Sequence, residues 1–136
     1  MTIGVIEKEE PFLAALIALA CESVGHDCLV FKDISQMTRI LHAIHFDTIV
    51  IDIQRPGVNG LDWLETMAPS WPDLPSRTLL LTNSKLTPED AVRIQKLGAE
   101  VAPRPRSLGE IELVVMERLQ TIQTGPPRVF RTPDFS

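Results

Sequence analysis

Short apolar runs and turn residues alternate along the 136-residue chain in a regular order. Apolar runs of four to eight residues that are rich in β-branched residues and bounded by turns are typical of buried strands in a parallel sheet. Longer stretches with apolar residues three or four positions apart are typical of helices that cover such a sheet. The pattern predicts five strands, at residues 2–6, 27–31, 46–52, 77–82 and 100–103.

A helix is predicted after each strand, because each intervening stretch carries apolar residues at helical spacing. Pro11 suits the first turn of a helix, Gly25 a C-terminal stop, and Thr87-Pro88 a helix start. The expected helices cover residues 12–24, 35–44, 61–67, 88–97 and 108–119. This alternation predicts an α/β fold with a flavodoxin-like, doubly wound parallel sheet of five strands in the order 2-1-3-4-5, with five helices.

The length and the 44% hydrophobic composition suit one domain with a core of ordinary size. We expect this domain to cover residues 1–123. Residues 124–136 are mostly Gly, Pro and polar residues with few apolar ones. We therefore expect a flexible C-terminal tail, unless it docks on a partner or on a second copy of the chain.

The net charge of −5 argues against nucleic-acid binding, which needs a basic face. No stretch of the sequence approaches the roughly 20 apolar residues of a membrane span, and the N-terminal residues lack the pattern of a signal peptide. Cys21 and Cys28 lack the spacing of a zinc site and are expected to be core thiols. We expect a cytoplasmic protein that binds neither nucleic acid nor a membrane.

Three of the predicted strands end on a polar side chain. Glu7 follows the first strand, Asp52 ends the third and Thr82 ends the fourth. In the order 2-1-3-4-5 these strands are neighbours, and open α/β sheets bind ligands outside the carboxyl ends of their strands. A lone aspartate there often only caps a turn, but three polar side chains at matching strand ends predict a site.

At these residues the sequence resembles the receiver domain of bacterial two-component response regulators, over about residues 2–120. The family's phosphoacceptor aspartate ends the third strand and is followed by a proline four residues later and a glycine eight residues later. Asp52, Pro56 and Gly60 match this motif in DIQRPGVNG. The family's acidic pair, switch hydroxyl and Lys-Pro fall, in chain order, on Glu7-Lys8, Thr82 and Arg104-Pro105.

The resemblance implies phosphoryl transfer to Asp52, with Thr82 as the switch hydroxyl. Arg104 replaces the lysine that grips the phosphoryl oxygens; it keeps the positive charge, but a guanidinium is a planar fork and an ammonium a point charge. The implied cofactor is Mg²⁺, which neutralises the charge that develops on the transferring oxygens. Its implied oxygen ligands are the carboxylates of Glu7 and Asp52 and the backbone carbonyl of Gln54.

Two features depart from the family pattern. Lys8 stands at the second acidic position, where a cation repels a metal ion instead of binding it, and its ammonium is expected to pair with Asp52, Glu7 or Glu9. No aromatic residue stands at the position of the family's switch aromatic, where Val101 is nearest. The resemblance also implies a cis Arg104–Pro105 peptide bond, since X–Pro bonds adopt cis at a cost of only about 0.5–1 kcal/mol.

Two functions follow from these features. The favoured hypothesis is a stand-alone receiver-like signalling protein of a two-component phosphorelay, not an enzyme, which keeps Asp52 but acts through protein–protein contacts. The alternative is a conventional single-domain response regulator that accepts a phosphoryl group on Asp52 with Mg²⁺. A small flavodoxin-like enzyme or FMN carrier is a third class, which the acidic turn after the first strand disfavours because it suits phosphate poorly.

The resemblance also implies a partner surface on the last two strand–helix units, at about residues 87–123. The implied partner is a histidine kinase, a phosphotransfer protein or a downstream target. A homodimer is left open by the sequence.

Overall fold

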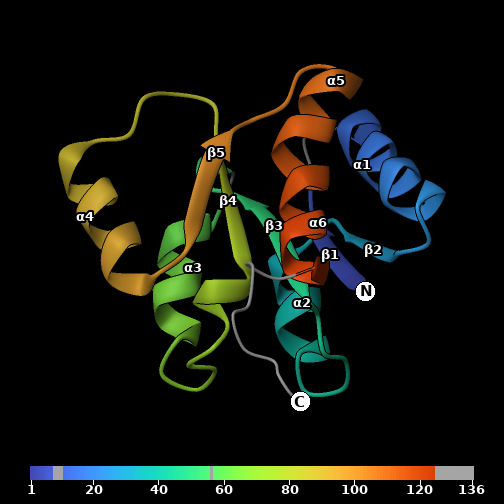
Figure 1. The fold of residues 1–136 in the computed structure, drawn as a ribbon. Coiled ribbons are helices and arrows are strands. Elements are labelled where there is room, and N and C mark those ends of the chain that lie inside the picture. The colour runs from blue at the N-terminus through green and yellow to red at the C-terminus, as the bar shows by residue number, and fades with distance from the viewer. Residues whose placement is uncertain (8–10, 56, 125–136) are drawn as a thin grey trace, which may run out of the picture.

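A five-stranded parallel sheet lies between two layers of helices (Figure 1). The structure is a computed structural model and describes residues 1–7, 11–55 and 57–124. The predicted strand order is confirmed, since the strands follow one another as β2-β1-β3-β4-β5. Their bounds are β1 (Thr2–Ile6), β2 (Asp27–Phe31), β3 (Thr48–Asp52), β4 (Thr78–Thr82) and β5 (Glu100–Pro103).

The helices follow the strands in the expected alternation. The first four are α1 (Pro11–Ser23), α2 (Ile34–Ile40), α3 (Gly60–Met67) and α4 (Pro88–Leu97). The C-terminal helix is built from α5 (Leu108–Ile111), a π-helical segment η2 (Glu112–Met116) and α6 (Glu117–Thr124). A short 3₁₀ helix, η1 (Pro75–Arg77), precedes β4. Within the described residues, no helix is long and apolar enough to cross a membrane.

The prediction that the second helix reaches residue 44 is wrong, because α2 ends at Ile40. The N–H of Ala43 donates to the carbonyl of Ile40 at 2.9 Å, an i→i+3 bond that tightens the helix end into a turn. Ile44, whose spacing suggested a longer helix, instead packs against the core from this turn. The predicted tail lies almost wholly outside the described residues.

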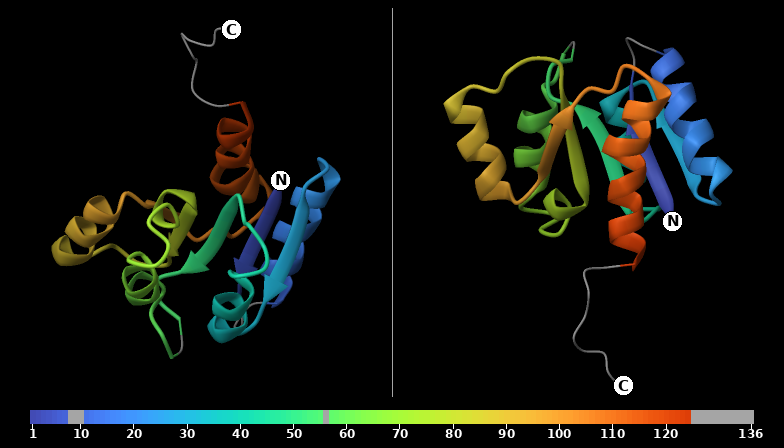
Figure 2. Two further views of the ribbon diagram at one scale, coloured as in Figure 1. Left: turned by 90° about the horizontal axis from the view of Figure 1, so that it is seen from below. Right: turned by 45° about the horizontal axis from the view of Figure 1, so that its top comes forward.

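Each face of the sheet has its own hydrophobic core (Figure 2). On one face α1 and the C-terminal helix pack against β1, β3 and β4, through Leu13, Ile17, Cys21, Ile111, Val115 and Leu119. On the other face α2, α3 and α4 pack through Ile34, Met37, Leu61, Trp63, Leu64 and Ile94, and Leu41 packs there from directly after α2. Because both faces are covered, β3 is buried along its whole length, which explains its unbroken apolar run.

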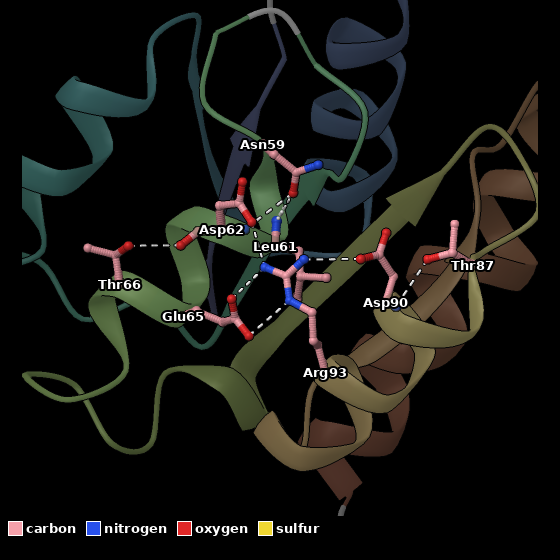
Figure 3. Close-up of polar contacts among 8 residues, drawn as sticks. All are labelled: Asn59, Leu61, Asp62, Glu65, Thr66, Thr87, Asp90 and Arg93. Carbon is pink, nitrogen blue, oxygen red and sulfur yellow. Dashed lines mark hydrogen bonds and ion pairs between the residues drawn. The ribbon is translucent and has the colours of Figure 1, made fainter.

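The helix α4 is attached to α3 by a group of charged side chains around Arg93 (Figure 3). Ile94 is the buried side chain of α4. The Arg93 guanidinium donates to Glu65 on α3, with Nε 3.1 Å from Oε2, and to Asp62 on α3, with Nη2 2.5 Å from Oδ1. It also donates to Asp90 on its own helix, with Nη1 3.0 Å from Oδ1. The position of α4 therefore depends on ion pairs as well as on a small apolar contact.

We expect Arg93→Ala to accelerate amide hydrogen exchange selectively in α4. The three carboxylates are partly or largely exposed, so solvent weakens the ion pairs and the loss in global unfolding free energy should stay below about 1 kcal/mol. Hydrogen exchange followed by mass spectrometry measures the effect, and Lys96→Ala, which removes an exposed charge from the same helix, is the control. Equal exchange in α4 of both variants would show that the Arg93 ion pairs do not hold the helix.

Candidate functional site

Glu7 and Asp52 lie side by side at the carboxyl ends of β1 and β3. The register pairs Ile6 with Ile51, so the residues that follow them are neighbours. Backbone hydrogen bonds continue beyond the strand ends, since the N–H of Glu7 donates to the carbonyl of Phe31 at 2.9 Å. Both carboxyl groups are buried, with 6% of Glu7 and 5% of Asp52 exposed. The sheet therefore holds two acidic side chains together in a position where water solvates them poorly.

Arg104 binds both carboxylates with one guanidinium. Its Nη2 donates to Oε1 of Glu7 at 2.6 Å, and its Nη1 donates to Oδ2 of Asp52. The backbone N–H of Arg104 donates to the carbonyl of Thr82 at 2.9 Å, which fixes the residue directly after β5. The side chain extends from there across the end of β4 and is 13% exposed. The planar fork of donors suits this bridge, which the single ammonium of a lysine would not reproduce.

The Arg104–Pro105 peptide bond is trans, so the prediction of a cis bond is wrong. Trans is the ordinary form of an X–Pro bond. The side chain of Arg104 still reaches Asp52, because its long stem and not the peptide geometry spans the distance between the strands.

Burial raises the pKa of Asp52 to about 7. The Arg104 guanidinium opposes the rise because it stabilises the carboxylate, whereas the neighbouring Glu7 raises the pKa further. Burial therefore acts against the ionised form of Asp52, and the ion pair with Arg104 acts in its favour. A carboxyl group that changes charge near pH 7 is a frequent feature of functional sites.

We expect Asp52 to make the folded protein less stable as the pH rises from about 4 to about 7. Its pKa is 3.8 in the unfolded chain and about 7 in the fold, so in this window the folded state binds more protons. The free energy of unfolding should fall by up to about 1.4 kcal/mol per pH unit and become constant above pH 7. Urea unfolding of the wild type and Asp52→Asn across this range measures the difference. Parallel curves would show that Asp52 ionises normally in the fold.

The hydroxyl of Thr82 lies next to Asp52 but contacts the side chain of Gln54. Thr82 Oγ1 and the backbone N–H of Asn83 both lie 3.1 Å from Oε1 of Gln54. Thr82 Oγ1 also lies 2.7 Å from the carbonyl of Ser84, and its single proton donates to one of these oxygens at a time. Two donors that would suit a phosphoryl oxygen thus converge on the amide oxygen of Gln54.

Gly60 lets the loop after Asp52 return close to β3. A Cβ atom at Gly60 would lie 2.2 Å from the backbone oxygen of Asp52 and 3.3 Å from Cγ1 of Ile51. The N–H of Gly60 donates to the carbonyl of Ile53 at 3.2 Å, and Asn59 caps the helix that begins here. A glycine is therefore required at position 60 of the DIQRPGVNG motif, because the backbone of Asp52 leaves no room for a side chain. Pro56 of the motif lies outside the described residues.

We expect Gly60→Ala to destabilise the protein by about 1–3 kcal/mol or more, because the new methyl group meets backbone that cannot move aside easily. Gly109→Ala is the matched control, since its nearest neighbour to a Cβ would be Ser107 Oγ at 3.9 Å. In α5, that change should be neutral or stabilising by about 0.5–1 kcal/mol. Urea unfolding of both variants checks the prediction, and equal effects would contradict it.

A shallow pocket of about 410 Å³ opens beside this constellation. It is lined by Thr82, Asn83, Ser84, Pro103, Arg104, Arg106 and Glu110. Sequence reasoning identified Thr82 and Arg104 but not the other residues. The Asn83 donor is a backbone group, which leaves no mark in the sequence, whereas the second arginine of the Arg104-Pro105-Arg106 run was a signal that could have been used.

The described residues offer few free ligands for a metal ion at this site. Glu7 and Asp52 are the predicted carboxylate ligands, but Arg104 already bridges them. Among the described residues, no group of three His, Cys, Asp or Glu side chains is placed to hold a metal. Gln54 contributes its side-chain oxygen to Thr82. Lys8, which was expected to pair with one of the acids, lies outside the described residues.

Comparison with known proteins points to one family. A family model for the response regulator receiver domain matches residues 3–102. The chain is also 26% identical, over 113 residues, to a probable transcriptional regulatory protein, TcrX, of Mycobacterium tuberculosis. That match covers 83% of this chain and 47% of the relative, so the chain spans about half the length of the curated relative.

Solved structures share the fold. The non-phosphorylated receiver domain of HemR from Leptospira biflexa has a TM-score of 0.74 and 26% identity, and the match covers 95% of this chain and 98% of that one. The response regulator TrrA from Thermotoga maritima, solved in complex with Mg²⁺ and beryllofluoride, has a TM-score of 0.69 and 17% identity. This second match covers 89% of this chain and 97% of that one, and it shows likeness of fold alone.

Proposed function

The chain belongs to the response regulator receiver domain family of two-component signalling, and we propose that it signals through protein–protein contacts while Asp52 is held in an internal ion pair. The observation that carries the proposal is the single guanidinium of Arg104 on both Asp52 and Glu7. In this arrangement a positive charge of the protein itself neutralises the two acids that would otherwise bind Mg²⁺.

The energetics favour the internal cation over a metal ion. Mg²⁺ requires near-octahedral oxygen ligands at short distances, so Arg104 would have to leave both carboxylates before the ion could bind them. Breaking a buried pair by removing one partner costs roughly 3–5 kcal/mol. A cost on the order of 3 kcal/mol would weaken Mg²⁺ binding by about a hundredfold.

The output route of a typical receiver is also altered. On β5, Val101 is the nearest residue to the family's switch aromatic, and it is 37% exposed. Thr82 is engaged with Gln54 and Ser84. We infer that the partner surface lies on α4, β5 and the C-terminal helix, within residues 87–123, and that the protein is a binding module and not an enzyme. Its partner in this proposal is a histidine kinase, a phosphotransfer protein or a downstream target.

A conventional phosphoacceptor is the second candidate, and one observation favours it. Oδ1 of Asp52 is buried without a hydrogen-bond partner among the described residues. This oxygen is available to attack a phosphoryl donor, whose leaving group would depart with its bonding electrons. Arg104 and the Thr82 and Asn83 donors would then stabilise the phosphoryl oxygens, once the side chain of Gln54 moved aside.

We expect the wild type to react with acetyl phosphate slowly and at a rate that Mg²⁺ does not change. The double variant Lys8→Asp with Arg104→Lys should label faster, and only with Mg²⁺, because it has the acidic pair and the lysine of the family. Intact mass spectrometry measures the labelled fraction, and Asp52→Asn controls for labelling elsewhere. Wild-type labelling on Asp52 that rises with Mg²⁺ as much as in the double variant would establish the conventional phosphoacceptor instead.

A further inference from the structure

An apolar groove runs between α1 and the C-terminal helix, on the face of the sheet away from α2, α3 and α4. These two helices lie side by side in Figures 1 and 2. The groove has a volume of about 580 Å³. Among the side chains that line it, Leu19 is 65% exposed and Leu113 is 64% exposed. Val24 and Leu108, also in the lining, are more than half exposed.

The groove exists because α1 has apolar residues on two faces. Leu13, Ile17 and Cys21 are buried against the sheet and form the apolar stripe by which a surface helix normally packs on its domain. Leu16, Leu19 and Ala20 form a second stripe at helical spacing, which lines the groove. A contiguous exposed apolar patch on a folded domain marks an interaction site more often than scattered single residues do.

We propose that residues 125–136 of the same chain occupy this groove. These residues lie outside the described part of the chain, and their sequence contains three large apolar residues, at Val129, Phe130 and Phe135. This inference goes beyond the signalling role proposed above and does not depend on Asp52. The tail would cover Leu19 and Leu113, which are the most exposed large apolar side chains in the lining.

The connection is short enough for this docking. The helix α6 ends at Thr124, one turn after Gln120, which lines the groove. An extended segment of this length spans about 40 Å, whereas the helix from Gln120 back to Leu108 is only about 18 Å long. A tethered segment also has an effective concentration in the millimolar range, well above that of a separate molecule. The sequence Gly125-Pro126-Pro127 gives the chain turn residues where it must reverse.

The charges of the two parts are complementary. The groove has carboxylates at Glu112 and Glu117 on the C-terminal helix. The tail has two arginines, Arg128 and Arg131, which flank Val129 and Phe130. An apolar pair between two basic residues thus matches an apolar groove with an acidic side, although the chain as a whole is acidic.

Solution NMR on the full chain tests the proposal. We expect nuclear Overhauser contacts between the ring of Phe130 and the methyl groups of Leu19 and Leu113, independent of protein concentration. Phe130→Asp should abolish these contacts, shift both leucine methyl resonances and increase the binding of a hydrophobic dye, whereas Thr132→Asp, which adds the same charge to the tail, should leave the contacts in place. The substitution leaves every residue of the two hydrophobic cores unchanged, so the domain itself should fold as the wild type does.

The charge pairing has its own test. Glu112→Arg should lower the docked population about two- to fivefold, and Arg128→Glu in the same chain should restore it. Absence of the Phe130 contacts, with unchanged methyl resonances in Phe130→Asp, would overturn the proposal. Methyl shifts that change on dilution would overturn it in favour of a second copy of the chain as the occupant. Each outcome is separable from the acetyl phosphate experiment, which reports on Asp52, a residue that does not line the groove.

Discussion

The buried ion pair of Arg104 with Asp52 and Glu7 is the interaction on which the functional site depends. It brings together residues from the ends of β1, β3 and β5, which are 97 positions apart at the extremes. Two buried carboxyl groups would repel each other, and one guanidinium shared between them offsets part of the cost of their desolvation. The same interaction occupies both acids, so the feature that makes the site stable also limits what can bind there.

The polar side chains at the strand ends are engaged with one another. Arg104 donates to Asp52 and Glu7, whereas the Thr82 and Asn83 donors contact the side-chain oxygen of Gln54. A ligand could bind these donors only after their internal hydrogen bonds were broken. This competition between internal and external partners is a matter of a few kcal/mol, which is the scale on which signalling domains change state.

The two faces of the molecule differ in how completely they are packed. On one face the Arg93 ion pairs supplement the single buried residue of α4. On the other, α1 has more apolar surface than the sheet can cover, and the excess lines the groove beside the C-terminal helix. Both features concern contacts made by helices and lie apart from the ion pair at the strand ends.

The sequence by itself determined the α/β alternation, the sheet order and the three polar strand ends, because these depend on local periodicity and on the topology that short connections allow. A motif match also predicted one site for Asp52, Thr82 and Arg104, of which the structure shows Arg104 in contact with Asp52. The tertiary structure alone decided that Arg104 contacts Glu7 as well as Asp52, that Gln54 faces Thr82 and that the bond before Pro105 is trans. Those outcomes depend on side-chain reach and on burial between distant strands, which no stretch of neighbouring residues encodes.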